Sequence, residues 1–202
     1  MLKEKQDIRR QQIQAAAYEL LEDKGYKATS MLAIAKQAKA SNETLYAWYG
    51  SKQNLFRALI TDNAAEVTAT IKQALTQETD LKKALNRIGP LLLTLVLSDK
   101  AIALNRAAAA DANETKVLGE TLASAGKNAV QPLIQELFEQ ARARQTIDFD
   151  DKEQISNVYL SLLIGDLQIR RVTGAIPKVT KAQINRRSSQ AVTLLLTLFP
   201  MS

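Results

Sequence analysis

Apolar residues return every three or four positions along most of the chain, which is the period of an α-helix. Residues 4–23 illustrate the pattern, since their apolar residues fall on one face: Ile13, Ala16, Ala17, Leu20 and Leu21. Gly25 follows them and suits the left-handed position that ends a helix. We therefore predict a helix over 4–23.

The same reading predicts eight more helices. They are expected at 30–38, 42–49, 51–77, 79–97, 99–112, 114–144, 152–173 and 181–199. Thr29, Ser41 and Ser51 precede three of them and are suited to cap a helix N-terminus. Gly89-Pro90 predicts a kink or break in 79–97, and Pro132 predicts a bend or restart in 114–144.

Composition agrees with an all-α fold. The 202 residues include seven glycines and four prolines, with 46% apolar and 24% charged residues. This is ordinary for a soluble globular protein. No secretory signal opens the chain, and the apolar run 91–97 is too short to span a bilayer. We therefore expect a cytoplasmic protein.

Charge and missing residue types narrow the function. The net charge is +6, and residues 1–60 hold ten basic and six acidic residues, against seventeen and fifteen in the rest. A basic N-terminal end favours approach to a polyanion. The chain has no cysteine or histidine, which removes thiol and imidazole chemistry and the commonest zinc ligands. We expect no enzyme activity, metal or cofactor.

The run from Leu20 to Phe56 resembles the helix-turn-helix head of the TetR family of bacterial transcriptional regulators. It contains GYKATSM, then IA, then SNETLYAWYGSKQNLF. The matching residues are Gly25, Tyr26, Thr29, Ser30, Met31, Ile34, Ala35, Ser41, Thr44, Leu45, Tyr46, Ser51, Lys52 and Leu55. Two positions depart from the pattern: Lys39 replaces a glycine at the turn, and Tyr49 replaces a phenylalanine.

The resemblance implies a DNA-binding domain over 1–50 and a larger helical domain over 51–202 for ligand binding and dimerisation, connected by helix 51–77. Helix 42–49 would lie in the major groove. The candidate DNA-binding residues are Ser30, Met31, Asn42, Glu43, Thr44, Tyr46, Trp48 and Lys52.

Each candidate has an expected role. Asn42 suits adenine and Glu43 suits cytosine, while Thr44 suits a base edge or a thymine methyl. Tyr46 and Trp48 are better placed for phosphate or sugar. Ser30 and Lys52 would hold the DNA backbone. The simpler alternatives are helix capping for the serine, a half-buried aromatic for Tyr46 and a solvated charge for Lys52.

Helices 152–173 and 181–199 are apolar on more than one side, which suggests that each packs on its own subunit and on a partner. In the second helix, Leu194, Leu195 and Leu198 belong to this apolar surface. The resemblance implies the same arrangement, a homodimer formed through these two helices as a four-helix bundle. The region containing alanines 107–110 is also similar to the AefR-like branch of the family.

Four residues are candidates for an effector pocket: Arg106, Asp111, Tyr159 and Asp166. The charged ones stand beside apolar helix faces, where a buried charge needs a partner. They would either orient a small, apolar effector or form salt bridges within or between subunits. Both readings stay open on the sequence alone.

Together these features predict a homodimeric repressor that binds a palindromic double-stranded operator and is released by an unknown small effector. An alternative is a helical DNA-binding protein without an effector, acting as an architectural or constitutive regulator. A carboxylate-based enzyme is a third reading, which the absent histidine, cysteine and glycine-rich phosphate loop disfavour.

Overall fold

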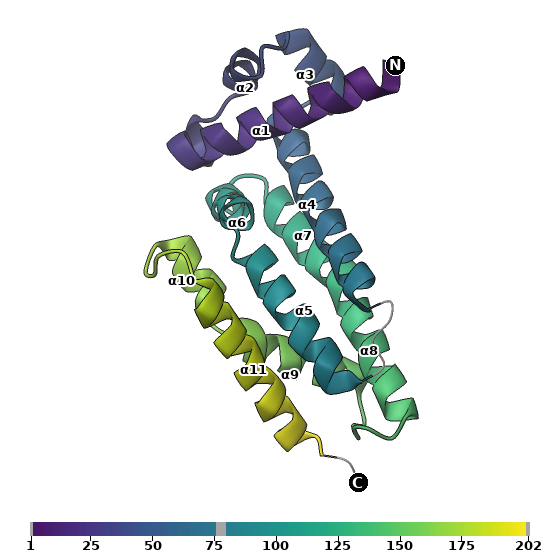
Figure 1. The fold of residues 1–202 in the computed structure, drawn as a ribbon. Coiled ribbons are helices and arrows are strands. Elements are labelled where there is room, and N and C mark those ends of the chain that lie inside the picture. Colours follow the sequence, from purple (N-terminus) through teal and green to yellow (C-terminus); the bar gives the residue numbers. More distant parts are fainter. Residues whose placement is uncertain (1, 76–79, 201–202) are drawn as a thin grey trace. The chain divides into compact units, whose positions relative to one another are not determined.

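The computed structural model describes residues 2–75 and 80–200, and every regular element within them is helical (Figure 1). The α-helices are α1 (Leu2–Ala28), α2 (Met31–Gln37), α3 (Asn42–Tyr49), α4 (Lys52–Leu75), α5 (Leu81–Val96), α6 (Asp99–Asp111), α7 (Val117–Ala125), α8 (Gln131–Ala143), α9 (Lys152–Ile164), α10 (Leu167–Thr173) and α11 (Lys181–Leu198). A π-helical turn, η1 (Gly126–Val130), joins α7 to α8. The predicted all-α fold is confirmed.

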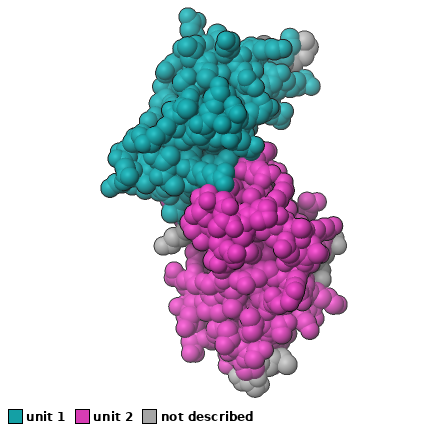
Figure 2. All heavy atoms as spheres, turned by 90° about the vertical axis from the view of Figure 1, so that its left-hand side faces the viewer, with its two compact units in different colours: residues 1–62, 103–123 teal, residues 63–102, 124–202 magenta. Residues whose placement is uncertain are grey.

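The chain forms two compact units, coloured separately in Figure 2. Unit 1 contains residues 1–62 and 103–123, and unit 2 contains residues 63–102 and 124–202. Helices α4, α6 and α7 each pass from one unit into the other. This division follows compactness, and the functional boundary expected at residues 50 and 51 stays a prediction.

Unit 1 is built on α1, which packs against α2, while α2 packs against α3. The predicted apolar face of α1 is buried, and Ile13 and Ala17 have no exposed surface. Gly25, with φ of 73°, interrupts α1 where the sequence predicts an end. The rings of Tyr26 and Phe56 pack edge to face, with centroids 5.2 Å apart and ring planes at 79°.

The helix starts in unit 1 follow the predicted caps with one correction. The Ser41 hydroxyl accepts from the Thr44 N–H, and the Ser51 hydroxyl accepts from the Asn54 N–H. Thr29 does not cap α2, because Ser30 does so instead by accepting from the Ala33 N–H. The two neighbouring residues have equivalent hydroxyls, so the sequence alone did not separate them.

Thr29 has a different role. Its side chain is buried and donates to the carbonyl oxygens of Leu20 and Gly25, at 3.2 and 2.8 Å. These contacts tie the end of α1 to the segment that leads into α2. Thr29 therefore stabilises the entry to the helix-turn-helix from the inside.

Unit 2 has one apolar core. Helix α11 packs against α5 and α9, and α8 packs against α9 and α5. The rings of Phe138 and Tyr159 pack edge to face with centroids 6.0 Å apart, and Phe149 packs against Phe138. Ile88, Leu93 and Leu195 are fully buried in the same cluster.

The sequence predicted a kink or a break at Gly89-Pro90, and the break is wrong, because α5 continues through both residues. Pro90 removes one backbone donor, which would otherwise bond the carbonyl of Asn86, and Asn86 is exposed to water. Gly89 serves close packing instead. A Cβ at this position would lie 2.2 Å from the Ser188 hydroxyl oxygen of α11.

The restart predicted at Pro132 is confirmed, since Pro132 stands in the first turn of α8 after the π-helical turn. The single helix predicted over 152–173 is wrong. Gly165, with φ of 52°, ends α9, and α10 begins after Asp166. Arg187 occupies the space beside Gly165 and donates from Nε to the Leu163 carbonyl at 3.0 Å.

The start of α6 is held to the α10 region by an ion-pair cluster in unit 2. Asp99 accepts from Arg171 at 2.9 Å and from Lys178 at 2.6 Å. The hydrogen bond and charge of Lys178 and the Arg171 guanidinium hold the pKa of the Asp99 carboxyl below its usual range, against the opposing effect of burial.

Across residues 2–75 and 80–200, no single helix is both long and apolar enough to cross a membrane. Helices α5 and α6, which meet at 53°, pass a test of length and composition only as a bent pair.

Candidate nucleic-acid interface

Helix α3 has one buried side and one open side. Leu45 has no exposed surface and Tyr49 is 8% exposed, so both fix α3 to unit 1. Burial raises the pKa of the Tyr49 hydroxyl, and the nearby charge of Arg10 partly offsets that effect. Gly50 then ends the helix with φ of 72°, a conformation that favours glycine.

The open side of α3 carries the predicted DNA-binding side chains. Asn42, Glu43, Tyr46 and Trp48 are exposed. Tyr46 is 50% exposed although it is aromatic, and Trp48 is 37% exposed. The side therefore presents an amide, a carboxylate, a phenol and an indole to the surroundings, which are groups able to contact base edges or phosphates.

Three further candidates lie near helix starts. The hydroxyl of Thr44 is 2.8 Å from that of Ser41, so it is engaged in the cap of α3. Ser30 is exposed and caps α2. Met31 is 5% exposed and packs in the core, so a contact with DNA from this position would come from its backbone N–H.

Lys52 points back onto its own unit. Its ammonium donates to the Tyr26 carbonyl and lies 4.0 Å from the centroid of the Tyr26 ring, a cation–π contact. Burial lowers the pKa of Lys52, while the charges of Glu114 and Asp111 act in the opposite direction. In this state Lys52 joins the start of α4 to the end of α1.

The α6–α7 corner supplies acidic groups to the same part of unit 1. Burial, followed by the charges of Asp111 and Glu114, raises the pKa of Tyr26 to about 12. Glu114 also pairs with Lys27 at 3.3 Å, although both side chains are largely exposed. The acidic residues of this corner therefore interact electrostatically with the end of α1, although the two segments are far apart in the sequence.

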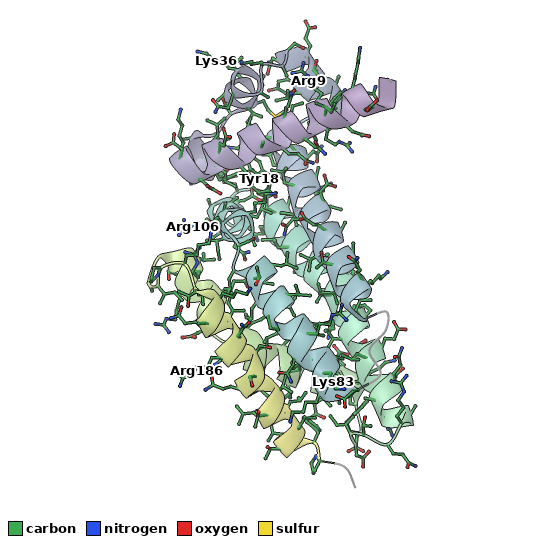
Figure 3. The ribbon with its side chains drawn as sticks, in the orientation of Figure 1. Arg9, Tyr18, Lys36, Lys83, Arg106 and Arg186 are labelled. Atoms are coloured by element: carbon green, nitrogen blue, oxygen red, sulfur yellow. The ribbon has the colours of Figure 1, made fainter. Side chains whose placement is uncertain are left out.

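The turn between α2 and α3 contains a residue in an unfavourable conformation. Lys39 has φ of 50°, in the left-handed region where a non-glycine residue costs about 1 kcal/mol. Arg9 extends from α1 (Figure 3). Its side chain donates to the carbonyl oxygens of Ala38 and Lys39, at 3.2 and 3.1 Å. Sequence reasoning missed this role, because the contact joins residues about thirty positions apart.

Sequence reasoning also missed Leu32. It is 67% exposed on α2, between the buried Met31 and the buried Ile34. The signal was present in the pattern, since position 32 lies outside the buried stripe of α2. Its exposure adds an apolar group to the otherwise polar surface of the helix-turn-helix.

The four pocket candidates fall in different environments. Asp111 is fully buried in unit 1, and its carboxylate accepts from the Thr115 hydroxyl and the Leu118 N–H. Arg106 is exposed and also belongs to unit 1. In unit 2, Tyr159 is fully buried, with its hydroxyl 3.5 Å from the Leu85 carbonyl.

The sequence placed Asp166 beside an apolar helix face, and this expectation is wrong, because Asp166 is exposed. The end of α9 at Gly165 turns it outward, and it pairs with Arg170 at 3.6 Å. Asp111 likewise has a structural role, since its carboxylate accepts from the Leu118 N–H in the first turn of α7. The pocket assignment of all four residues stays a prediction.

The three leucines of α11 that the sequence assigned to one apolar surface differ in exposure. Leu195 is fully buried in unit 2, while Leu194 and Leu198 are 52% and 60% exposed. On α9, Val158 and Leu162 are half-buried, and an open hollow runs along this side between Asp151 and Leu162. Leu194 and Leu198 stand one helical turn apart, so they add apolar groups to one exposed side of α11.

A helix-turn-helix with an open polar face, in a chain whose second unit is also helical, is an arrangement typical of helical DNA-binding regulators. No group of three or more acidic residues in the described part of the chain is arranged to hold a metal ion. Two family models match the chain. Residues 13–59 match the bacterial regulatory proteins of the tetR family, and residues 83–199 match the C-terminal domain of AefR-like transcriptional repressors.

The chain belongs to the TetR family of bacterial transcriptional regulators, in its AefR-like branch. This confirms both the predicted family and the prediction that the protein is a regulator and not an enzyme. The functional class therefore rests on two matches that cover the head and most of the second unit.

Two curated relatives match in sequence. The HTH-type transcriptional activator FasR of Mycolicibacterium smegmatis is 35% identical over 79 residues, which are 39% of this chain and 36% of the relative. The HTH-type transcriptional regulator YvkB of Bacillus subtilis is 37% identical over 78 residues, which are 39% of this chain and 40% of the relative. The alignments therefore span about two fifths of these relatives.

Solved structures match over nearly the whole chain. A TetR-family regulator from Mesorhizobium loti has a TM-score of 0.84 at 21% identity, covering 96% of this chain and 97% of that one. The flavonoid-responsive regulator FrrA has a TM-score of 0.72 at 28% identity, covering 97% and 100%. A TetR regulator from Agrobacterium tumefaciens has a TM-score of 0.74 at 28% identity, covering 94% of each chain.

Proposed function

We propose that the protein is a homodimeric TetR-type repressor whose two heads bind the half-sites of a palindromic DNA operator and are released by a small, apolar effector. The observation that carries the proposal is the open face of α3, where amide, carboxylate and aromatic side chains remain exposed above a fully buried Leu45.

Base readout is assigned to the first turn of α3. Asn42 can bond adenine through two hydrogen bonds, and Glu43 can accept from cytosine N4. Both side chains are exposed, and within residues 2–75 and 80–200 neither is held away from a groove by a side-chain hydrogen bond or ion pair. Thr44 contributes through its methyl group, since its hydroxyl is engaged with Ser41.

Phosphate binding is assigned to Tyr46, Trp48 and the start of α2. The N–H groups of the first turn of α2 and the Ser30 hydroxyl suit an anion. The Lys52 ammonium already donates to the Tyr26 carbonyl and lies over the Tyr26 ring, which leaves fewer of its N–H groups for phosphate. We therefore assign it a smaller share of DNA affinity and a structural role in the free protein.

The dimer is assigned to the outer sides of α9 and α11. Leu194 and Leu198 are exposed, which is unfavourable for a monomer in water. Charges support two-fold pairing: Asp151 and Glu153 lie at the start of α9, while Arg186 lies on the exposed side of α11. A symmetric interface lets these groups meet in both directions.

The effector is assigned to unit 2, whose core is almost wholly apolar around Tyr159. The flavonoid response that names FrrA supports an aromatic or similarly apolar molecule. Such a ligand would act through its differential affinity for the states of the dimer that fit the operator and those that do not. Native mass spectrometry of the purified protein tests this part by showing which adduct copurifies.

Selection from random duplex DNA tests the proposal as a whole. We expect the chain to enrich a palindrome and Asn42→Ala to relax the preference at one position in each half-site. Gln12→Ala, on an exposed position of α1, is the matched control and should select the same palindrome. Enrichment of no motif by the unaltered chain would refute sequence-specific binding.

A regulator without an effector is the second candidate. The packing of Tyr159 against Phe138 and the structural role of Asp111 favour it, because both residues have sufficient structural reasons to be present. A dimer that binds the palindrome equally well with and without every copurifying molecule would support this candidate over the first.

A further inference from the structure

The turn between α2 and α3 has the hydrogen bonds of a glycine turn but no glycine. The Ala40 N–H donates to the Ala35 carbonyl at 2.9 Å, and the Lys39 N–H donates to the Lys36 carbonyl at 3.2 Å. This is the Schellman arrangement, in which the left-handed position is usually glycine. Here Lys39 takes that position with φ of 50°.

A second element holds the turn closed. Nη1 of Arg9 donates to two carbonyl oxygens of the turn. One belongs to Ala38, the C-cap residue of α2, and the other to Lys39, the left-handed residue. A positive group at this end of a helix is also favoured by the helix dipole. Arg9 comes from α1, so the contact fastens the turn to the helix on which the head is built (Figure 3).

The turn sets the direction of α3. Ser41 and Asn42 follow the turn by two and three residues, and Asn42 is the first residue of α3. A change in the backbone at Lys39 would therefore re-aim the residues assigned to base readout, while leaving the buried Leu45 as the main anchor of the helix.

We propose that Arg9 is a positioning residue for sequence recognition: it holds the non-glycine turn at Lys39 in its left-handed conformation and so fixes the direction of α3. The inference rests on the proposed function. It assigns to Arg9 no direct contact with DNA, which separates it from an arginine that binds phosphate.

Affinity and salt dependence together distinguish these roles. The variants are Arg9→Ala, Arg9→Lys, Lys39→Gly and the double variant Arg9→Ala/Lys39→Gly. Lys5→Ala, an exposed position on α1 with the same loss of charge, is the control. Each full-length protein is titrated with the selected palindrome and with an unrelated duplex at several salt concentrations, after thermal unfolding has shown that it is folded.

We expect Arg9→Ala to lower affinity for the palindrome about tenfold while affinity for the unrelated duplex and the salt slope stay as in the unaltered chain. Lys39→Gly should restore most of that loss, because glycine adopts the turn without steric cost. Arg9→Lys should restore part of it, since lysine can bond one carbonyl but lacks the planar fork.

Two results would overturn the inference. If Arg9 binds phosphate, both affinities fall together in Arg9→Ala and the salt slope decreases by about 0.9. If the double variant Arg9→Ala/Lys39→Gly binds the palindrome no better than Arg9→Ala, then Arg9 does not act on DNA binding through the conformation of the turn. An unaltered chain that prefers no duplex would instead refute the proposed function, so the two failures are distinguishable.

Discussion

The outer faces of α3 and α11 are built by the same rule and suit different partners. Each helix is fixed by a fully buried leucine, Leu45 in α3 and Leu195 in α11. The open face of α3 then presents polar and aromatic tips, whereas the open face of α11 presents Leu194 and Leu198. Polar tips match the hydrated edges of DNA, while exposed leucines match another apolar surface.

The comparison shows that two neighbouring residues of the same type can have different roles, because one is buried and the other is exposed. Leu194 and Leu195 are adjacent and chemically identical, but one is 52% exposed and the other is fully buried. Substitutions at these two positions should therefore fail in different ways, and substitutions on the open face of α3 should leave both stability and assembly unchanged.

The largest effect is expected from Leu195→Asp. It buries an unpaired carboxylate in the core of unit 2 and should lower the free energy of unfolding by at least about 4 kcal/mol. Denaturant titration followed by circular dichroism measures this change. Ser189→Asp, on the exposed side of the same helix, is the control and should change little. A stable Leu195→Asp protein would contradict the buried placement.

The next effect is expected from Leu194→Asp combined with Leu198→Asp. Both positions are exposed, so the protein should stay folded but sediment as a monomer. Its affinity for a palindrome should fall at least about 100-fold, because two linked heads bind more tightly than two separate ones. A dimer that persists in sedimentation would remove α11 from the interface.

A smaller effect is expected from Asn42→Ala. Loss of a bidentate base contact should cost about 1–3 kcal/mol for the preferred duplex and nearly nothing for an unrelated one. Competition binding with single-base variants of the selected palindrome measures this difference. Equal losses for all duplexes would show that Asn42 contacts the DNA backbone.

Lys39→Gly should act on stability alone. It relieves the left-handed strain at φ of 50° and should stabilise the protein by up to about 1 kcal/mol, although glycine also adds freedom to the unfolded chain. The expected rise in the unfolding midpoint is about 2–4 °C for each 1 kcal/mol in a chain of this size. A lower midpoint would mean that the Lys39 side chain itself is stabilising.

The smallest effect concerns Asp99. Because its pKa is lowered in the folded state, its contribution to stability is present at neutral pH and is lost as the pH falls below the ordinary value of 3.8. Its side chain is 51% exposed, so the contribution should stay below about 1 kcal/mol. The difference in unfolding free energy between wild type and Asp99→Asn should therefore shrink on acidification, and a constant difference would exclude the ion pairs.

Much of the head could be predicted because its determinants are local. The caps at Ser41 and Ser51 and the stop at Gly50 depend on residues within one turn. Two features of the head were missed because they depend on residues distant in the sequence. Ser30 rather than Thr29 caps α2, and Arg9 holds the turn after α2. The Thr29 contact reaches back to Leu20, and the Arg9 contact crosses to another helix.

Unit 2 was less predictable, because its breaks depend on partners far along the chain. Gly89 and Gly165 look alike in the sequence, yet α5 continues through the first and α9 ends at the second. Ser188 fills the space beside Gly89, and Arg187 fills the space beside Gly165. Helical periodicity carries no information about these contacts from α11.

Sedimentation with DNA most directly tests the account that α3 binds DNA and α11 forms the dimer. The chain is mixed with its selected palindrome, and with the same duplex after one half-site is scrambled. We expect two chains on the palindrome and an affinity at least about 100-fold above that for the scrambled duplex. The Leu194→Asp/Leu198→Asp protein should bind both duplexes equally weakly. One unaltered chain per duplex, bound with the same affinity to both, would contradict the account.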